Sequence, residues 1–170
     1  MTSPDVRRRP PATADERTML TGWLDWQRAT VRMKCAGVSE TDAHRAPLPS
    51  SPLMSIAALV SHLRWAEYGW FEVGFLGEPN RAPSVDNGPF AEWRVDGIAL
   101  PRLLDDYDRQ CARSREIVAA HDLDQLEAYA PPGLELVSLR WIVGHMIEET
   151  ARHLGHLDAL RELADGVTGY

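Results

Sequence analysis

The sequence predicts an all-α protein, a four-helix bundle with at least one long crossover connection. Apolar residues recur at three- and four-residue spacings through four segments, as they do on the buried face of an amphipathic helix. Pro, Gly and Asp collect between these segments, and none shows the alternation of a half-buried strand. The chain of 170 residues suffices for one core but not for two ordinary ones. We therefore expect one domain over residues 13–170 and a mobile N-terminal tail over residues 1–12.

The first two helices have recognisable ends. The first is expected over residues 13–36, and Gly37 follows as a stop. The second begins near Ser55, whose hydroxyl can accept a hydrogen bond from a backbone N–H of the first turn. It continues to Gly77, because glycine readily adopts the left-handed conformation that ends a helix.

The last two helices are delimited in the same way. The third is expected over residues 100–121, with Pro101 in the first turn, where a missing N–H costs nothing. The fourth begins at Ser138 and ends before Gly166, which makes it about 40 Å long.

Two of the connections are longer than simple turns. Residues 37–54 and 77–98 exceed the usual length of a helix-to-helix link, so at least one of them is expected to cross the bundle. The second contains the aromatic residues Phe90 and Trp93. We interpret it as a surface connection pinned by these two rings, in preference to a mobile lid.

Composition excludes several classes of protein. The net charge of −7 disfavours a broad nucleic-acid surface, which needs clustered Lys and Arg. No stretch approaches the roughly 18 apolar residues of a membrane span, and the N-terminus lacks a signal-peptide core. We therefore expect a cytoplasmic protein that binds neither nucleic acid nor membrane. Cys35 and Cys111 form no CxxC motif and are expected to be buried free thiols.

The most informative pattern lies in the fourth predicted helix. His145, Glu149, His153 and His156 recur at spacings of four, four and three residues, which places them on one face. Imidazoles and a carboxylate are ligands that suit a divalent ion such as zinc. One helix rarely supplies more than two ligands to one ion, so a further ligand is expected from another helix, and His62 is the best candidate.

The residues around His62 leave space for a partner. Ala58 and Ala66 lie one turn to either side, and Gly69 extends this stripe of small side chains. Trp65 lies on the same side of the helix and is the better candidate for a pocket wall, whereas Trp70 is expected to fill the core.

The residues alone leave a second interpretation open. His62 and His153 would then be core histidines with ordinary hydrogen bonds, and Glu149 would pair with Arg152 or another arginine on the surface. Glu148 is a rival ligand, but it points about 100° away from the line through the neighbouring histidines and is expected to face solvent.

At these positions the chain resembles a known family. The segments that carry the resemblance are Val60-Ser61-His62-Leu63, followed by Glu67 and Trp70-Phe71, and the stretch His145-Met146-Ile147-Glu148-Glu149-Thr150-Ala151-Arg152-His153-Leu154-Gly155-His156. They resemble the DinB/YfiT-like superfamily of four-helix-bundle metalloproteins, most closely the actinobacterial branch that shares its metal-binding domain with mycothiol-dependent maleylpyruvate isomerase. This resemblance assigns the ligand roles to His62, Glu149 and His153.

The resemblance also implies an activity. We expect one divalent metal ion, with zinc as the leading candidate before nickel, iron or manganese, and a low-molecular-weight thiol as co-substrate. The metal-activated thiolate would attack a small electrophile in an S-transfer reaction, with His156 as a catalytic group and with His145 and Trp65 contacting the substrate. The alternatives are a metal-dependent hydrolase and a non-catalytic, stress-related module that binds a metal or ligand. A homodimer is expected for this family.

Overall fold

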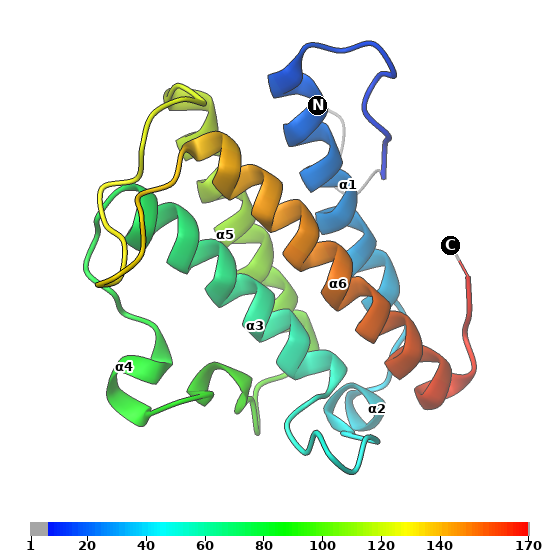
Figure 1. Cartoon of the computed structure of the whole chain (residues 1–170). Coiled ribbons are helices and arrows are strands. Elements are labelled where there is room, and N and C mark those ends of the chain that lie inside the picture. The colour runs from blue at the N-terminus through cyan, green and yellow to red at the C-terminus, as the bar shows by residue number, and fades with distance from the viewer. Residues whose placement is uncertain (1–6, 170) are drawn as a thin grey trace.

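Four long helices lie side by side and enclose the core (Figure 1). The computed structural model describes residues 7–169. The long helices are α1 (Glu16–Cys35), α3 (Ile56–Tyr68), α5 (Leu100–Ala120) and α6 (Leu139–Asp165). Helix α1 packs against α6, and α3 packs against both α5 and α6. The predicted all-α bundle is therefore confirmed, and no strand forms within the described residues beyond one isolated bridge.

Side-chain caps fix where these helices begin. Ser55 Oγ accepts a hydrogen bond from the backbone N–H of Ala58 at 3.1 Å, and Ser138 Oγ accepts one from Trp141 at 3.2 Å. Both residues are the N-caps that the sequence predicted. Helix α1 starts a few residues later than predicted because the carboxylate of Asp15 caps it instead.

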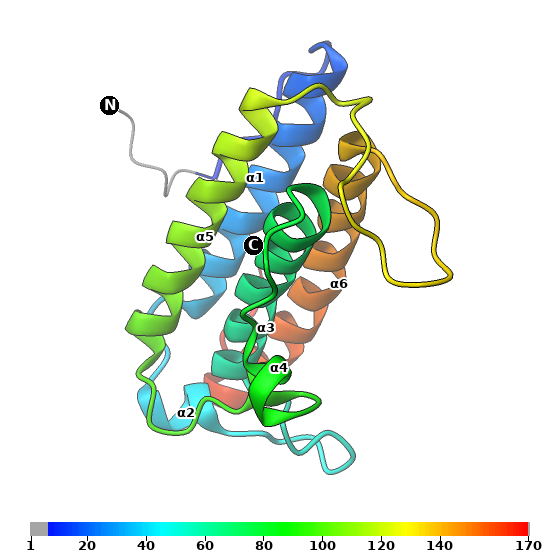
Figure 2. The same ribbon diagram turned by 90° about the vertical axis from the view of Figure 1, so that its left-hand side faces the viewer.

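The connection between α3 and α5 is the predicted crossover. Both helices run in the same direction, so residues 76–99 return along the bundle before α5 begins (Figure 2). This stretch carries the short helix α4 (Pro83–Asn87) and a 3₁₀ turn, Ala91–Trp93. The link from α1 to α3 stays at one end of the bundle and contains α2 (Glu40–His44).

Only one of the two aromatic residues in the crossover pins it, which corrects the prediction. Trp93 packs against the core cluster, whereas Phe90 is 64% exposed. Phe90 also has a φ of 63°, a left-handed backbone conformation that residues other than glycine seldom adopt. The turn geometry at Phe90 directs its ring outward, and sequence spacing alone does not reveal this.

A buried ion pair ties α1 to α3. Arg28 Nε and Nη2 donate to the two carboxylate oxygens of Glu67 at 2.8 and 2.7 Å. Glu67 is fully buried and Arg28 is 5% exposed. Burial alone would lower the pKa of Arg28, but the neighbouring Glu67 carboxylate outweighs it and the pKa is raised. Arg28 is therefore charged, and it depends on the Glu67 carboxylate for compensation inside the protein.

The described part of the predicted tail lies against α1. Arg7 Nε donates to Thr30 Oγ1 at 2.9 Å, and its guanidinium lies 4.0 Å from the ring centroid of Trp26. The rest of that prediction concerns residues 1–6, which lie outside the described residues. Cys35 and Cys111 are buried free thiols, as predicted. None of the described helices is long and apolar enough to span a membrane.

Candidate metal centre

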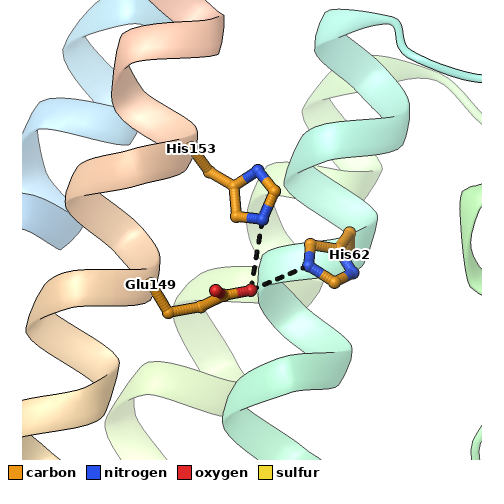
Figure 3. Close-up of side chains that lie close together, drawn as sticks. All are labelled: His62, Glu149 and His153. Atoms are coloured by element: carbon orange, nitrogen blue, oxygen red, sulfur yellow. Dashed lines mark hydrogen bonds and ion pairs between the residues drawn. The ribbon is translucent and has the colours of Figure 1, made fainter. Parts of the chain in front are cut away.

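His62 of α3 meets Glu149 and His153 of α6 between the two helices (Figure 3). Glu149 Oε1 lies 3.1 Å from His62 Nε2 and 3.1 Å from His153 Nε2. The three side chains remain partly accessible, with exposed fractions of 21% for His62, 19% for Glu149 and 11% for His153. The predicted cross-helix cluster therefore forms, and a small ligand can reach it.

The local structure explains why these atoms converge. Glu149 and His153 are one helical turn apart on α6, so their side chains project in the same direction. The small residues Ala58 and Ala66 flank His62 on α3, and α3 packs directly against α6. The stripe of small side chains thus brings His62 within reach of the α6 pair, as the sequence predicted.

Hydrogen bonds settle the charge of Glu149. The bonds from His153 and His62 hold the pKa of this carboxyl well below its usual range. Glu149 is therefore ionised and accepts from the Nε2–H of both rings. The alternative ion pair of Glu149 with Arg152 does not form in the described structure.

The geometry of the cluster fits a divalent ion. One donor atom from each of His62, Glu149 and His153 lies within 4.8 Å of the other two, and no other group of three such ligands occurs within residues 7–169. A tetrahedral ion bound at about 2.0–2.1 Å separates its ligands by about 3.3 Å, close to the two observed separations of 3.1 Å. A set of two imidazoles and one carboxylate matches zinc and also suits neighbouring divalent ions.

Trp93 lies beside the cluster, a position that sequence reasoning missed. Its ring stacks on His62 with centroids 4.3 Å apart and an interplanar angle of 21°. It also lies 6.1 Å from the ring of His153. The crossover has no helical periodicity, so no sequence signal placed Trp93 beside the cluster. In the structure Trp93 covers His62 and limits how its ring can rotate.

His156 contacts the cluster through His153. The Nδ1 atoms of the two rings are 3.3 Å apart, which requires one to donate and the other to accept. Burial, followed by the nearby His153 and Arg152, lowers the pKa of His156. If His153 Nε2 binds a metal ion, the proton of a neutral His153 ring lies on Nδ1, and a neutral His156 can accept that Nδ1–H.

His145 and Glu148 lie at the edge of the cluster. The ring of His145 stacks on Trp141 at 5.1 Å and meets Trp70 at 4.7 Å. Glu148 is 61% exposed and lies 3.7 Å from His145 Nδ1, so it faces away from the three converging ligands, as predicted. His145 does not join the cluster itself but lies one turn from Glu149.

Trp65 occupies another environment. Its ring packs against Tyr68 at 5.5 Å, and the guanidinium of Arg64 lies 3.5 Å from its centroid. It lines a cavity of about 690 Å³ beneath the crossover, together with Ser61 and Arg64. Trp93 rather than Trp65 therefore stacks on His62, and a substrate-binding role for Trp65 stays a prediction.

Comparison with known proteins identifies a family. A family model described as mycothiol-S-transferase matches residues 19–166, which include all four long helices except the first residues of α1. The search of curated proteins gave no match.

Proposed function

The chain belongs to the mycothiol-S-transferase family, and from this premise we propose that it is a metal-dependent enzyme that transfers a mycothiol-type thiol to a small electrophile. The observation that carries this proposal is the convergence of His62, Glu149 and His153. Two imidazoles and one carboxylate can hold a divalent ion and leave a position open for a thiol. The family membership supports mycothiol as that thiol.

The ligand count suits the chemistry. A metal ion held by three protein ligands keeps an open position, where it can bind a thiol, lower its pKa and hold it as a thiolate. His62 and His153 would contribute their Nε2 atoms, and Glu149 an oxygen whose negative charge partly offsets that of the ion. The partial exposure of all three side chains leaves a path for the thiol.

The protein's own cysteines are poor candidates for the nucleophile. Burial raises the pKa of Cys35 to about 12 and also raises that of Cys111. At neutral pH both remain thiols, which are much weaker nucleophiles than thiolates. This supports an external thiol as the sulfur donor.

We assign His156 a positioning role. Its acceptance of the Nδ1–H of His153 would fix the tautomer and orientation of the ligating ring. His156→Leu should then weaken metal binding by about 10–100-fold. Because Gln carries an amide oxygen that can accept a hydrogen bond, His156→Gln should restore part of this affinity. Equal losses in the two variants would contradict the positioning role.

The decisive assay follows thiol consumption. Metal-loaded protein should accelerate the reaction of mycothiol with 1-chloro-2,4-dinitrobenzene, and His153→Ala should abolish both metal binding and turnover. Glu148→Gln, which alters the exposed neighbour of Glu149, is the matched control and should retain both. Turnover that survives in metal-free His153→Ala protein would overturn the proposal.

The same assay separates the alternatives. Turnover of a substrate without any thiol would favour the metal-dependent hydrolase, in which water replaces the thiol. A protein that binds metal and loses stability in His153→Ala, yet consumes no thiol with any electrophile, would favour a non-catalytic binding module.

A further inference from the structure

A cavity lies near the candidate metal centre, lined by residues of α3, α6 and the loop that joins α5 to α6. Its volume is about 790 Å³, within the range of sites for small organic molecules. Ala66 and Gly69 of α3 line it together with the tryptophans Trp70 and Trp141. The segment from Glu127 to Val137, which joins α5 to α6, contributes most of the remaining lining.

The cavity lies close to the metal centre on both helices. Ala66 lies one turn after His62, about 6 Å along α3. On α6, His145 lies one turn before Glu149, and its ring contacts both tryptophans of the cavity wall. His145 therefore contacts the wall of the cavity on one side and lies one helical turn from a metal ligand on the other.

Large apolar side chains are exposed around the cavity. Leu134 is 68% exposed, Tyr129 is 50% exposed and Trp141 is 47% exposed, and all three line it. Apolar groups gathered in this way around a concavity mark a binding site more often than chance exposure. Trp70, which the sequence assigned to the core, packs against the core cluster and also forms part of this wall.

The loop that completes the cavity is held in place by backbone hydrogen bonds. Ala128 N and Tyr129 N donate to the carbonyl of Gly74 at 3.1 and 3.0 Å. The carboxylate of Glu127 accepts from Val137 N at 3.1 Å across the loop. These bonds connect the loop to Gly69–Phe75, the π-helical segment that follows α3, so the cavity is preformed and does not depend on a ligand to organise it.

The charges of the cavity select among ligands. Glu127 and Glu135 are the charged residues of its described lining, which includes no Arg, Lys or His. Two carboxylates without a cation repel an anion and tolerate a neutral or cationic molecule. The aromatic walls favour a flat ring, which can stack on Trp70 or Trp141.

We propose that this cavity holds the flat, apolar body of a neutral or cationic electrophile and directs its reactive carbon toward the metal centre, and that it discriminates against anionic electrophiles. The inference rests on the proposed function. In the reaction with 1-chloro-2,4-dinitrobenzene, the thiolate sulfur forms a bond to the ring carbon that carries chlorine. Chloride leaves with the bonding electron pair, and the proton of the thiol passes to solvent.

Binding without reaction is the first test. The probe is 1,3-dinitrobenzene, which has no leaving group, and its affinity for the metal-loaded full chain is measured by calorimetry. Trp141→Ala should weaken binding about tenfold because a stacking partner is lost. Trp23→Ala removes a partly exposed tryptophan of α1 that lies outside this cavity and should leave the affinity unchanged. Equal affinities in the wild type and Trp141→Ala would overturn the proposal.

Charge selection is the second test. With mycothiol as the thiol, we compare kcat/KM for the neutral 1-chloro-2,4-dinitrobenzene with kcat/KM for the anionic 4-chloro-3,5-dinitrobenzoate. In the wild type, the ratio of the first to the second should exceed the ratio of the uncatalysed rates. Glu135→Lys should lower this ratio about fivefold or more, because a cation then replaces a carboxylate at the cavity. Glu116→Lys makes the same charge change at an exposed position of α5 outside the cavity and should leave the ratio unchanged.

The two tests separate failure of the cavity from failure of the proposed function. One outcome is turnover in which Glu135→Lys leaves the kcat/KM ratio unchanged and Trp141→Ala leaves the affinity for 1,3-dinitrobenzene unchanged. This outcome would refute the role of the cavity and leave the S-transferase activity supported. Binding of 1,3-dinitrobenzene that depends on Trp141, without any thiol consumption, would support the cavity as a binding site and refute the S-transferase activity. A dimer in solution that Leu134→Asp dissociates would show that a second copy covers this surface, which would also overturn the proposal.

Discussion

Glu67 should be essential for stability although it has no part in the metal centre. Glu67→Gln removes the negative charge that compensates Arg28 and replaces one accepting oxygen by a donor amide. Arg28 is only 5% exposed, and its remaining partner Asp25 is 43% exposed. Breaking one side of a buried ion pair typically costs about 3–5 kcal/mol. For a chain of this length, that loss lowers the thermal midpoint by about 6–20 °C.

Matched variants turn this expectation into a sharp test. Asp25→Asn removes the more exposed carboxylate that pairs with Arg28. This change should lower the free energy of unfolding by less than about 1 kcal/mol. The double variant Arg28→Met with Glu67→Leu replaces the ion pair by an apolar contact and should recover most of the lost stability. The assay is guanidinium unfolding of the metal-free protein. If Glu67→Gln lowers the free energy of unfolding by no more than Asp25→Asn does, the buried ion pair is not essential for stability.

The remaining predictions concern the thiols, the cluster and one helix cap. Cys35 and Cys111 should not react with a disulfide reagent in the folded protein at pH 8. A pKa of about 12 leaves Cys35 a thiolate fraction of about 10⁻⁴ at this pH, and the fraction rises tenfold per pH unit. A cysteine that reacts rapidly in the folded protein would contradict this prediction. Glu149→Gln should weaken metal binding in a chelator competition by about 100-fold or more, since it removes the anionic ligand; an unchanged affinity would exclude Glu149 as a ligand. Trp93→Ala should weaken it by about tenfold, because the His62 ring loses its stacked neighbour, and equal affinity would show that this stacking is incidental. Ser55→Ala should lower the free energy of unfolding by about 1 kcal/mol and leave metal content unchanged, and a loss of metal would contradict a purely capping role.

Local signals made the main helices predictable. Ser55 and Ser138 lie where N-caps are needed, and the positive φ of Gly166 matches the predicted end of α6. The π-helical segment Gly69–Phe75 continues α3 toward the predicted stop at Gly77, which also has a positive φ. The i, i+4 spacing of Glu149 and His153 placed two ligands on one face, because this relation depends only on helical geometry. The small residues around His62 indicated the helix that supplies the third side chain.

Non-local features escaped sequence reasoning. Trp93 reaches His62 only because the crossover folds back along the bundle, and nothing in its own segment encodes that path. Trp70 and Trp141 form a cavity wall because the loop that joins α5 to α6 bonds to the carbonyl of Gly74. Such contacts arise from tertiary packing, so periodicity along the chain cannot reveal them.

Metal content is the most direct test of the central claim. The full chain is purified without added metal and without a metal-binding tag, and its metals are measured by elemental analysis beside the His153→Ala variant. The account predicts nearly one equivalent of a divalent metal per chain, with zinc as the leading candidate, and its loss in the variant. No metal in either protein, even after reconstitution, would contradict the account and return His62, Glu149 and His153 to the role of ordinary hydrogen-bonded side chains.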